Sequence, residues 1–392
     1  MSSMSFLEKL LDGLEVEWKA LGEIVKTVTA PAKLKRESYR DVGKTPIIDQ
    51  GVNFIAGYTD EDVKALPCNE YVIFGDHSEH IKYVDFSFIQ GADGLKILKT
   101  VSDVSKYIYY AFQNFYQKEL NYKRHWSRAS ETLIPIPCPE NPKKSLEIQA
   151  EIVRILDTFT EMTTELTTEL TARKKQYNYY RDQLLSFPCS SVGTQGEVEW
   201  KTLGEVAKIG TGSHDTQDAI EDGDYVFYAR GREPLRLDVF DFDETAIITA
   251  GDGAGVGKVF HYAQGKYALH QRAYRIVPSE VMEPRFVYHC IRSYFYAYIQ
   301  KASVSSSVTS LRRPMFLNFP IPVPSLAEQA RIVAILDKFD ALTNSISEGL
   351  PREIALRQKQ YAYYRDLLLS FPKAKPETPL ECGEITWIRS AK

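Results

Sequence analysis

The residues whose types and spacing come nearest to a catalytic motif lie in a glycine-rich stretch, ITAGDGAGVGKVFHYAQGKYALHQRAYR (residues 248–275). A phosphate-binding P-loop needs G-x-x-x-x-G-K-[ST], because its amides cradle the phosphates and its hydroxyl binds magnesium. Gly257 and Lys258 supply the second glycine and the lysine, but Asp252 replaces the first glycine and Val259 the hydroxyl. The G-x-G-x-x-G dinucleotide motif also lacks its third glycine. The stretch therefore does not predict nucleotide chemistry.

No other catalytic motif is complete. The sequence has no D/N-P-P-Y/F loop of an adenine methyltransferase and no helicase or nuclease motif. His77, His80 and His125 could suggest a metal or catalytic cluster, but no second group of ligands stands at helical spacing, so polar surface or DNA contact is expected. The acidic residues of 215–224 are too dense for a paired-carboxylate site and predict a solvated loop. We therefore expect a non-catalytic chain that binds no metal and no cofactor of its own.

Cysteine usage and hydropathy indicate the compartment. The five cysteines are scattered and form no C-x-x-C pair, which predicts reduced thiols and no zinc site. The N-terminal residues do not resemble a signal peptide, and no apolar run approaches 18 residues. A cytoplasmic protein without a membrane span is expected.

Charge is unevenly distributed along the chain. The net charge is −4 and the pI about 6.1, which is not the profile of a simple basic nucleic-acid binder. Three stretches are nevertheless basic and lie next to aromatic residues: 105–128, 251–275 and 300–316. One such stretch would indicate a solvated face, whereas three on an acidic chain favour contact with nucleic acid.

An internal duplication organises the sequence. Four segments occur twice, and the pairs are GLEVEWKALGEIVK (13–26) with GEVEWKTLGEVAK (196–208), IPIPCP (134–139) with FPIPVP (319–324), QAEIVRILDTF (149–159) with QARIVAILDKF (329–339), and RKKQYNYYRDQLLSFP (173–188) with RQKQYAYYRDLLLSFP (357–372). A partial third copy, CGEITW, follows at 382–387. We hypothesise that this tail folds back on the first domain. Variable blocks thus alternate with constant blocks.

The constant blocks have the three-and-four spacing of helices that pair. The predicted seam residues are Phe159, Met162, Leu166, Leu170, Tyr177, Tyr180 and Leu184 in the first block and Phe339, Leu342, Ile346, Tyr361, Tyr364 and Leu368 in the second. The first block would form a helix roughly 65 Å long at about 1.5 Å per residue. One such helix is not stable alone, and a folded block separates the two copies. The sequence therefore predicts an antiparallel coiled-coil pair.

The two constant blocks differ in one place. The first contains a tandem four-residue repeat, TTELTTEL (163–170), and each unit of such a repeat adds about 6 Å of helix. The second contains SEGLPREI (347–354), in which Pro351 predicts a break or kink near Gly349 and Leu350. The first segment is either an irregular coiled coil or an adjustable spacer.

The variable blocks mix short strand-like and helical runs, and each is long enough for an independent α/β domain. The expected fold is mixed α/β with a pseudo-twofold repeat. Its expected parts are a first domain (1–144), a first conserved helix (145–187), a second domain (188–324), a second conserved helix (325–371, with a break near 349–351) and a tail (372–392).

These motifs resemble the specificity subunit of type I restriction-modification systems, most closely the IC branch. The resemblance covers nearly the whole chain and rests on the duplicated EVEWKxLGE opening, the PIPxP exits, RIVAILDKFD, the RKKQYNYYRDQLLSF pair and EGLPREI. The four-residue repeat (163–170) is its most specific feature. The resemblance implies two target-recognition domains that read the halves of an asymmetric, bipartite DNA site, with a gap set by the four-residue repeat.

The resemblance also implies the partners. They are double-stranded DNA, two methyltransferase subunits and, through these, restriction subunits. S-adenosylmethionine, ATP and Mg²⁺ would be bound by the partner subunits, which agrees with the motifs missing here. Because partners would supply positive charge, we expect weak DNA binding by the isolated chain and strong, salt-dependent binding by the complex.

The glycine-rich stretch then takes another interpretation. Small residues let a loop approach the duplex, Lys258 is suited to a phosphate, and Gln271 and Arg272 can bind adenine and guanine in bidentate fashion. The alternative is ordinary turn glycines and an internally packed His270. The candidate DNA-binding residues are His77, Ser78, His80, Lys82, Lys123, Arg124 and Arg128 in the first domain and Arg230, Arg232, Gly253, Gly255, Lys258, His270, Gln271, Arg272, Lys301, Ser305, Ser307, Arg312 and Arg313 in the second.

Two other functions remain open. A nucleotide-dependent enzyme is disfavoured by the P-loop mismatch. A coiled-coil adaptor with two protein-binding heads accounts for the helices, but it gives no reason for basic, glycine- and serine-rich heads of divergent sequence. An orphan or antirestriction chain without a functioning partner is a subsidiary alternative.

Overall fold

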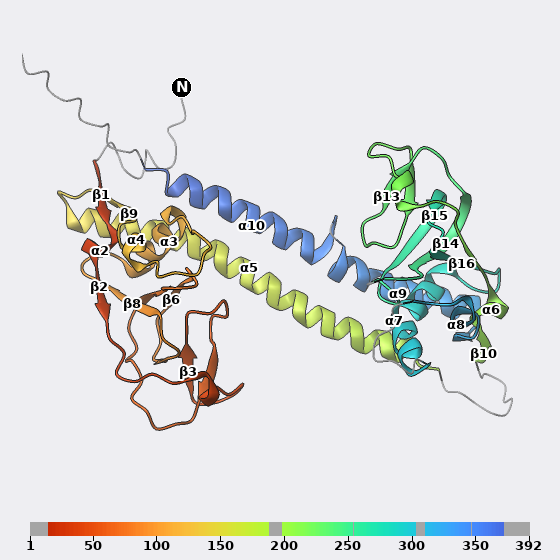
Figure 1. The fold of residues 1–392 in the computed structure, drawn as a ribbon, viewed down its shortest axis with the longest axis horizontal. Coiled ribbons are helices and arrows are strands. Elements are labelled where there is room, and N and C mark those ends of the chain that lie inside the picture. Colours follow the sequence, from red (N-terminus) through yellow and green to blue (C-terminus); the bar gives the residue numbers. More distant parts are fainter. Residues whose placement is uncertain (1–14, 188–197, 254, 303–309, 346, 372–392) are drawn as a thin grey trace, which may run out of the picture. The chain divides into compact units, whose positions relative to one another are not determined.

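The computed structural model describes residues 15–187, 198–253, 255–302, 310–345 and 347–371. Ser305, Ser307, Ile346 and the tail with its third repeat copy lie outside the described residues. The chain forms two compact units, one comprising residues 1–165 and 355–392 and the other residues 166–354. Each unit therefore contains one variable block together with parts of both constant blocks (Figure 1).

The first unit is built on three small sheets. They are the pair β1 (Val16–Ala20) and β9 (Leu133–Pro137), the four-stranded sheet β2 (Val25–Val28), β8 (Leu95–Thr100), β5 (Tyr71–Gly75) and β6 (Ile81–Val84), and the three-stranded sheet β4 (Gly57–Thr59), β3 (Thr45–Ile48) and β7 (Ile89–Gln90). Its helices are α2 (Leu21–Ile24), α3 (Ser105–Phe115) and α4 (Trp126–Ser130), with a 3-10 turn at Arg36–Ser38.

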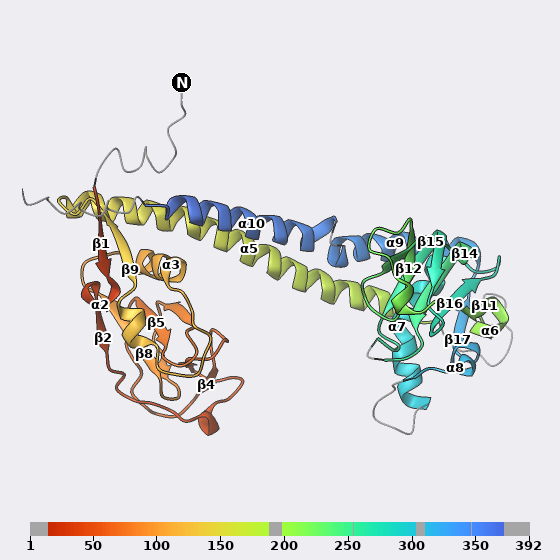
Figure 2. The same ribbon diagram turned by 45° about the horizontal axis from the view of Figure 1, so that its top comes forward.

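The second unit has the corresponding elements in the same order. They are the pair β10 (Glu199–Thr202) and β17 (Pro320–Val323), the six-stranded sheet β11 (Ala207–Thr211), β16 (Ala273–Pro278), β14 (Phe242–Ala250), β15 (Phe260–Leu269), β12 (Tyr225–Tyr228) and β13 (Leu235–Leu237), and the helices α6 (Leu203–Val206), α7 (Pro284–Ala302) and α8 (Arg313–Leu317). A 3-10 turn spans Thr216–Asp218. Helix α7 lies against β14, β15 and β16 (Figure 2).

The two variable blocks share one topology although their sequences differ. In the second unit β12 pairs in parallel with β15, and in the first unit β3 pairs in parallel with β7. An isolated parallel bridge repeats as well, Lys33 with Gln90 and His214 with His270. The continuous strand β15 thus replaces the separate strands β6 and β7. The duplication therefore includes the variable blocks, and the mixed α/β class expected from the sequence is confirmed.

The repeated edge motifs form the strand pair that closes each block. Trp18 of β1 faces Pro135 of β9, and Trp200 of β10 faces Pro322 of β17. A proline cannot donate a ladder hydrogen bond and is therefore suited to an edge strand. The EVEWK and PIPxP motifs are consequently two halves of one structural element, although about 120 residues separate them in each copy.

The constant blocks form helices. Helix α5 runs without interruption over Pro142–Leu184, whereas the second block divides into α9 (Leu326–Asn344) and α10 (Gly349–Leu368). Gly349 has φ +77°, and Pro351 lies in the first turn of α10, where a missing amide is tolerated. Helix α9 already ends at Asn344, where Ser345 takes an extended conformation, and Gly349 begins α10, so the interruption precedes the proline by about one turn.

The predicted seam residues make the helix contacts within each unit. In the first unit Phe159 stacks on Tyr364 with ring centroids 5.1 Å apart, and Leu368 is buried with Leu156. In the second unit Tyr180 stacks on Phe339 at 5.8 Å, and Tyr177 is buried beside it. The remaining described seam residues, Met162, Leu166, Leu170, Leu184, Leu342 and Tyr361, are half-buried.

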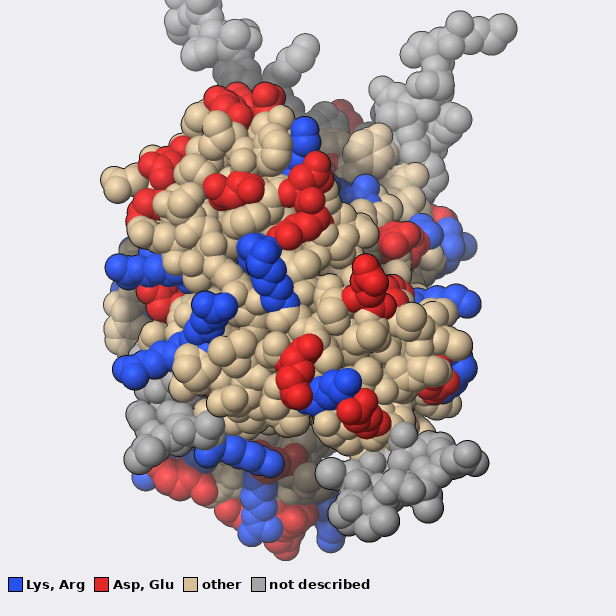
Figure 3. All heavy atoms as spheres, turned by 90° about the vertical axis from the view of Figure 1, so that its right-hand side faces the viewer, with Lys and Arg blue, Asp and Glu red and all other residues tan. Residues whose placement is uncertain are grey.

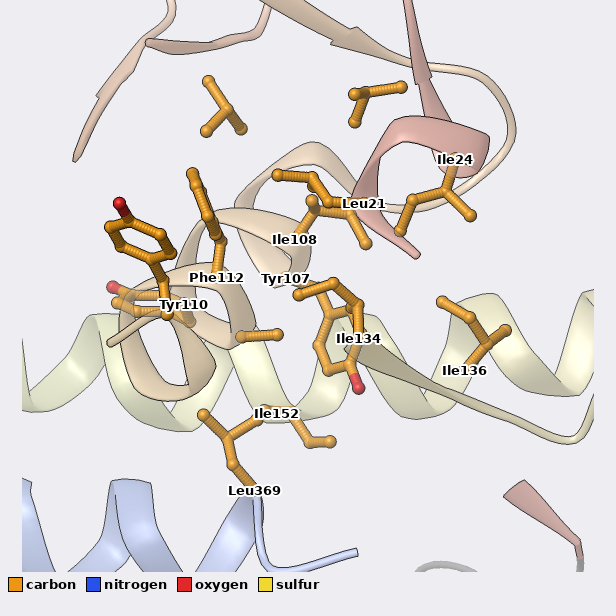
Figure 4. Packing of buried hydrophobic residues seen from close by; sticks show 14 of the residues in the cluster. Leu21, Ile24, Tyr107, Ile108, Tyr110, Phe112, Ile134, Ile136, Ile152 and Leu369 are labelled. Carbon is orange, nitrogen blue, oxygen red and sulfur yellow. The ribbon is translucent and has the colours of Figure 1, made fainter. Parts of the chain in front are cut away.

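The core of the first unit joins three distant parts of the chain. Ile108 and Phe112 of α3, Ile152 of α5 and Leu369, directly after α10, belong to one buried cluster (Figure 4). Its labelled members come from α2, α3, β9, α5 and the residue after α10, and Leu369 lies on the side of α5 that faces α10. Among the described residues no helix is both long and apolar enough to cross a membrane.

Candidate nucleic-acid interface

Three loops of the second unit meet around one carboxylate. Arg230 follows β12, Asp252 follows β14 and Arg272 follows β15. One Asp252 carboxylate oxygen lies 3.0 Å from Nη1 of Arg230, and the other lies 3.1 Å from Nη1 of Arg272. Burial raises the pKa of Asp252, but the hydrogen bonds and charges of the two arginines outweigh it and hold that pKa below its ordinary value. The carboxylate is therefore ionised and binds two guanidinium groups.

Two hollows adjoin this ion-paired group. The larger, of about 630 Å³, is lined by the Arg230–Glu233 loop, Gly253, Gly255 and Lys258. The smaller, of about 260 Å³, is lined by Gln271, Arg272, Tyr274 and Ser310 among others. Asp252 and its neighbours contribute to both hollows. The concave edge thus combines arginine, lysine, amide and hydroxyl groups, which are the groups that contact DNA phosphates and base edges.

The glycines of the motif shape this edge. Gly253 has φ +83° and no neighbour that an added Cβ would meet within 4 Å, so it faces open space. A Cβ at Gly255 would lie 2.9 Å from the carbonyl oxygen of Arg230, which requires the two loops to approach closely. The glycines therefore allow the loops to turn and to approach each other closely, which agrees with the absence of a P-loop motif.

The predicted side chains of this domain take different positions. Lys258 is exposed with its Nζ 5.0 Å from the centroid of the Tyr296 ring. The Gln271 amide donates to Asp215 at 2.9 Å. Arg232, Lys301, Arg312 and Arg313 are exposed. All of these remain available to a ligand that approaches from solvent.

His270 does not fit a DNA contact. Its side chain is 1% exposed, stacks on Phe227 and accepts a hydrogen bond at Nδ1 from the backbone amide of Arg272. Burial lowers its pKa, and Arg230 adds to that effect. His270 is therefore packed internally, which is the alternative that the sequence left open, and it holds the turn that presents Gln271 and Arg272.

The corresponding loops of the first unit also meet. Gln50 follows β3, His77 follows β5 and Asp93 follows β7. The Gln50 amide donates to the Asp93 carbonyl at 3.0 Å and accepts from the His77 amide at 3.2 Å, and the Ser78 hydroxyl donates to the Gln50 carbonyl. The His77 ring stacks on the exposed ring of Tyr122 at 5.2 Å. His77 and Ser78 therefore belong to the loop junction that matches the Asp252 group.

Other predicted residues of the first unit serve structure instead. Lys82 is buried and donates to the carbonyl oxygens of Asp49 and Asn53 at 2.8 and 2.6 Å, so it is not a DNA contact. Burial lowers its pKa. Its alternating strand position explains the error: β6 directs it inward, and backbone carbonyls satisfy its charge.

The three predicted basic residues after α3 are Lys123, Arg124 and Arg128. Lys123 lies 2.6 Å from a carboxylate oxygen of Glu119, and Arg128 pairs with that carboxylate too. Arg124 is exposed and His80 is half-buried. Burial lowers the pKa of His80, with further lowering by Lys118 and Lys82. His125 is buried and lies 3.4 Å from Glu79, so the three histidines do not form an exposed cluster.

The sequence did not identify Gln50, Lys33, Asp93 or the partnership of Asp252 with two arginines. The available signal was structural: each residue lies at or near the end of a strand that has a counterpart in the other unit. Lys33 lies 2.9 Å from Asp93.

Within the described residues no group of three or more His, Cys, Asp and Glu side chains could hold a metal ion.

The surface charge of the second unit is mixed. On the face that Figure 3 presents, lysine and arginine side chains lie among aspartate and glutamate side chains and do not form one continuous basic patch. This agrees with the net charge of −4 and with paired arginines at the loop junction. Charge complementarity alone therefore does not define the site.

Comparisons with solved structures support the fold. A type I restriction-modification S subunit from M. genitalium aligns with a TM-score of 0.65 at 17% identity, covering 93% of this chain and 98% of that one. A second structure, described as the structural basis of complex assembly and conformational transition of the type I R-M system, aligns with a TM-score of 0.53 at 16% identity, covering 91% of this chain and 98% of that one. These similarities show the fold.

Sequence comparisons show the family. The EcoR124I/EcoR124II specificity subunit of Escherichia coli is 44% identical over 96% of this chain and 99% of its own length. The EcoprrI specificity subunit of Escherichia coli is 32% identical over 89% and 93%. Residues 14–174 and 196–356 each match the family described as the type I restriction modification DNA specificity domain. The chain therefore belongs to the family of type I restriction-modification specificity subunits, as its repeated motifs indicate.

Proposed function

We propose that the two units are target-recognition domains that read the two halves of an asymmetric, bipartite DNA site. The observation that carries the proposal is the repeated loop junction: the same three strand ends meet in both units, yet they present different side chains. A constant scaffold with divergent loops suits a protein that reads two different base sequences.

The candidate contacts fall into two chemical classes. Gln271 and Arg272 can make bidentate contacts with base edges, whereas Lys258, Arg232, Lys301, Arg312 and Arg313 suit phosphates. In the first domain His77, Ser78, Arg124 and the neighbouring Gln50 and Tyr122 are the corresponding candidates. Residues of the first class would set sequence preference, and those of the second would set affinity and its dependence on salt.

The partners follow from the family. The chain assembles with methyltransferase and restriction subunits and directs them to DNA, and we propose that two methyltransferase subunits bind the constant helices. In this assembly the partner subunits carry out adenine methylation, ATP-driven translocation and cleavage. They, and not this chain, would bind S-adenosylmethionine, ATP and Mg²⁺. We expect the complex to act in the cytoplasm.

A methylation map at base resolution tests this function. The host genome is compared with the gene intact, deleted and restored on a plasmid. Loss of N6-methyladenine from one asymmetric, two-part motif with a fixed gap, and its return on restoration, would support the proposal. An unchanged map would refute it and would favour the coiled-coil adaptor.

A further inference from the structure

Two aspartates, Asp215 and Asp252, contact the candidate DNA-binding side chains at the loop junction of the second unit. Arg230 and Arg272 have exposed side chains, 43% and 64%, and both reach the same carboxylate of Asp252, which is 23% exposed. Gln271 is held in a similar way by Asp215 at 2.9 Å. The side chains suited to base contact are thus bound to aspartates.

The fold itself does not require this arrangement. The first unit also has a Gly-Asp pair at the end of the corresponding strand, since Gly75 is the last residue of β5 and Asp76 follows it directly. There one Asp76 carboxylate oxygen accepts from the backbone amides of His125 and Trp126, at 3.0 and 2.8 Å, and so holds the start of α4. In the second unit the carboxylate of Asp252 binds the exposed side chains of Arg230 and Arg272 instead. The equivalent aspartate therefore binds backbone amides in the first unit and exposed arginine side chains in the second.

The charge balance has a direct consequence for DNA binding. Two arginines carry two positive charges, and Asp252 reduces their sum to one. Non-specific affinity depends on the number of cations that meet phosphates, whereas base reading depends on the geometry of the guanidinium fork. The described ion pairs use Nη1 of each arginine, and a guanidinium has five N–H donors, so a held arginine still has donors for a base.

We propose that Asp252 is a specificity-determining positioning residue: it holds Arg230 and Arg272 in register at the loop junction and suppresses their attraction to non-specific phosphates. This inference rests on the proposed DNA-reading function. The ligand is duplex DNA with a guanine that one of the two arginines reads. Asp252 acts through the arginines and need not touch the DNA.

The test uses the full chain assembled with its methyltransferase subunits. Affinity is measured over a range of salt concentrations for the duplex with the mapped motif, for duplexes with either half substituted, and for a duplex with both halves scrambled. The variants are Asp252→Asn and, as a control for the same change in charge, Asp222→Asn at an exposed turn. Arg272→Lys keeps the charge but removes the planar fork.

For Asp252→Asn we expect tighter binding to scrambled DNA, with a slope of log K against log salt steeper by about one, because one guanidinium charge that Asp252 neutralised becomes free to contact a phosphate. We expect discrimination against substitutions in one half of the motif to fall roughly tenfold, with the other half still read normally. Arg272→Lys should relax the same half. Asp222→Asn should change neither the slope nor the discrimination.

Three results would overturn the inference. An unchanged discrimination in Asp252→Asn would show that the carboxylate does not set specificity, and equal slopes in Asp252→Asn and Asp222→Asn would show that it does not restrain the arginines. Loss of discrimination in both halves would assign Asp252 to folding or assembly. Failure of the proposed function is separate, because the unaltered complex would then fail to distinguish the mapped motif from the scrambled duplex.

Discussion

Asp157 and Asp337 occupy the same position in the two copies of the repeat, and each binds a helix of its own unit at two points one turn apart. Asp157 lies 2.8 Å from Nζ of Lys106 and 2.7 Å from the Tyr110 hydroxyl on α3. Asp337 lies 2.6 Å from Nη2 of Arg285 and 2.7 Å from Nε2 of His289 on α7. The constant block keeps its carboxylate while each variable block supplies different partners.

A second pair of repeat positions behaves in the same way. The Gln149 side-chain oxygen accepts from the Val104 amide at 2.9 Å, and the Gln329 oxygen accepts from the Glu283 amide at 2.7 Å. Both glutamines are fully buried. In each copy the glutamine precedes the aspartate by about two helical turns. Together the two residues fix the first turns of α3 in the first unit and of α7 in the second. This joint is common to both units and tolerates different recognition domains.

The joint predicts a pH-dependent stability for the second unit. His289 and Arg285 outweigh burial and lower the pKa of Asp337 from 3.8 to about 2. Because the folded-state pKa is depressed, the stabilisation is present above the unfolded-state pKa and is lost as the pH falls from about 4 to about 2. With a discount for a carboxylate that is 36% exposed, Asp337→Asn should cost roughly 1 kcal/mol at pH 7.

Hydrogen exchange of the α7 amides is the suitable measurement, because it reports opening of this unit alone. Asp337→Asn should exchange faster than the unaltered chain at pH 7, and the difference in opening free energy should shrink as the pH approaches 3. Asp366→Asn is the control, since Asp366 is exposed and bonds to the adjacent Arg365. A difference that stays constant with pH would contradict the assignment.

Substitution of Gly349, the first residue of α10, should lower the stability of the second unit. Its φ is +77°, and an added Cβ would overlap the carbonyl oxygen of Ala341. Gly349→Ala should therefore destabilise the second unit by roughly 2 kcal/mol or more, from left-handed strain together with displacement of α9. Gly265→Ala is the matched control, because φ is +79° there but nothing lies within 4 Å. Urea unfolding that gives equal losses for the two variants would show that the close approach is unimportant.

The helices were predictable from the sequence because their contacts are periodic and local. Phe159, Tyr364 and Phe339 were identified from three-and-four spacing alone, and their rings stack as such a seam requires. The break before α10 was predicted from Pro351, but Gly349 and the end of α9 at Asn344 place it one turn earlier. Periodicity thus locates a seam well and a helix end less well.

The recognition edges were not predictable to the same degree, because burial and pairing depend on the sheet. Lys82 and His270 have residue types typical of DNA contacts, yet both are buried: the register of β6 directs Lys82 inward, and His270 stacks on Phe227 in the turn after β15. In the sequence Asp252 is only the residue that breaks a P-loop pattern, because its two arginines lie 22 and 20 residues away. Only the shared topology of the two units, which their variable sequences conceal, brings these loops together.

Lys258 offers a test of phosphate contact at the larger hollow. If it neutralises one phosphate, Lys258→Gln should weaken binding by the assembled complex to all sequences alike and reduce the salt slope by about one. Lys266→Gln is the control, since Lys266 is also an exposed lysine over an aromatic ring, 4.6 Å from the Phe240 centroid, but it is not part of either hollow. Equal effects of the two substitutions on affinity and slope would remove Lys258 from the interface.

The four-residue repeat in α5 offers a test of the spacer. Residues 163–170 lie inside one uninterrupted helix that packs in a buried cluster on either side of the repeat, through Ile152 and Leu156 before it and through Tyr177 after it, and Leu185, directly after the helix, belongs to the second cluster. An added TTEL unit should lengthen the helix by about 6 Å without altering either cluster. The methylation map should then show the same two half-sites with a different gap. Thr164→Ala keeps the helix length and should leave the gap unchanged. Altered bases in a half-site would instead mean that the insertion disturbs a recognition domain.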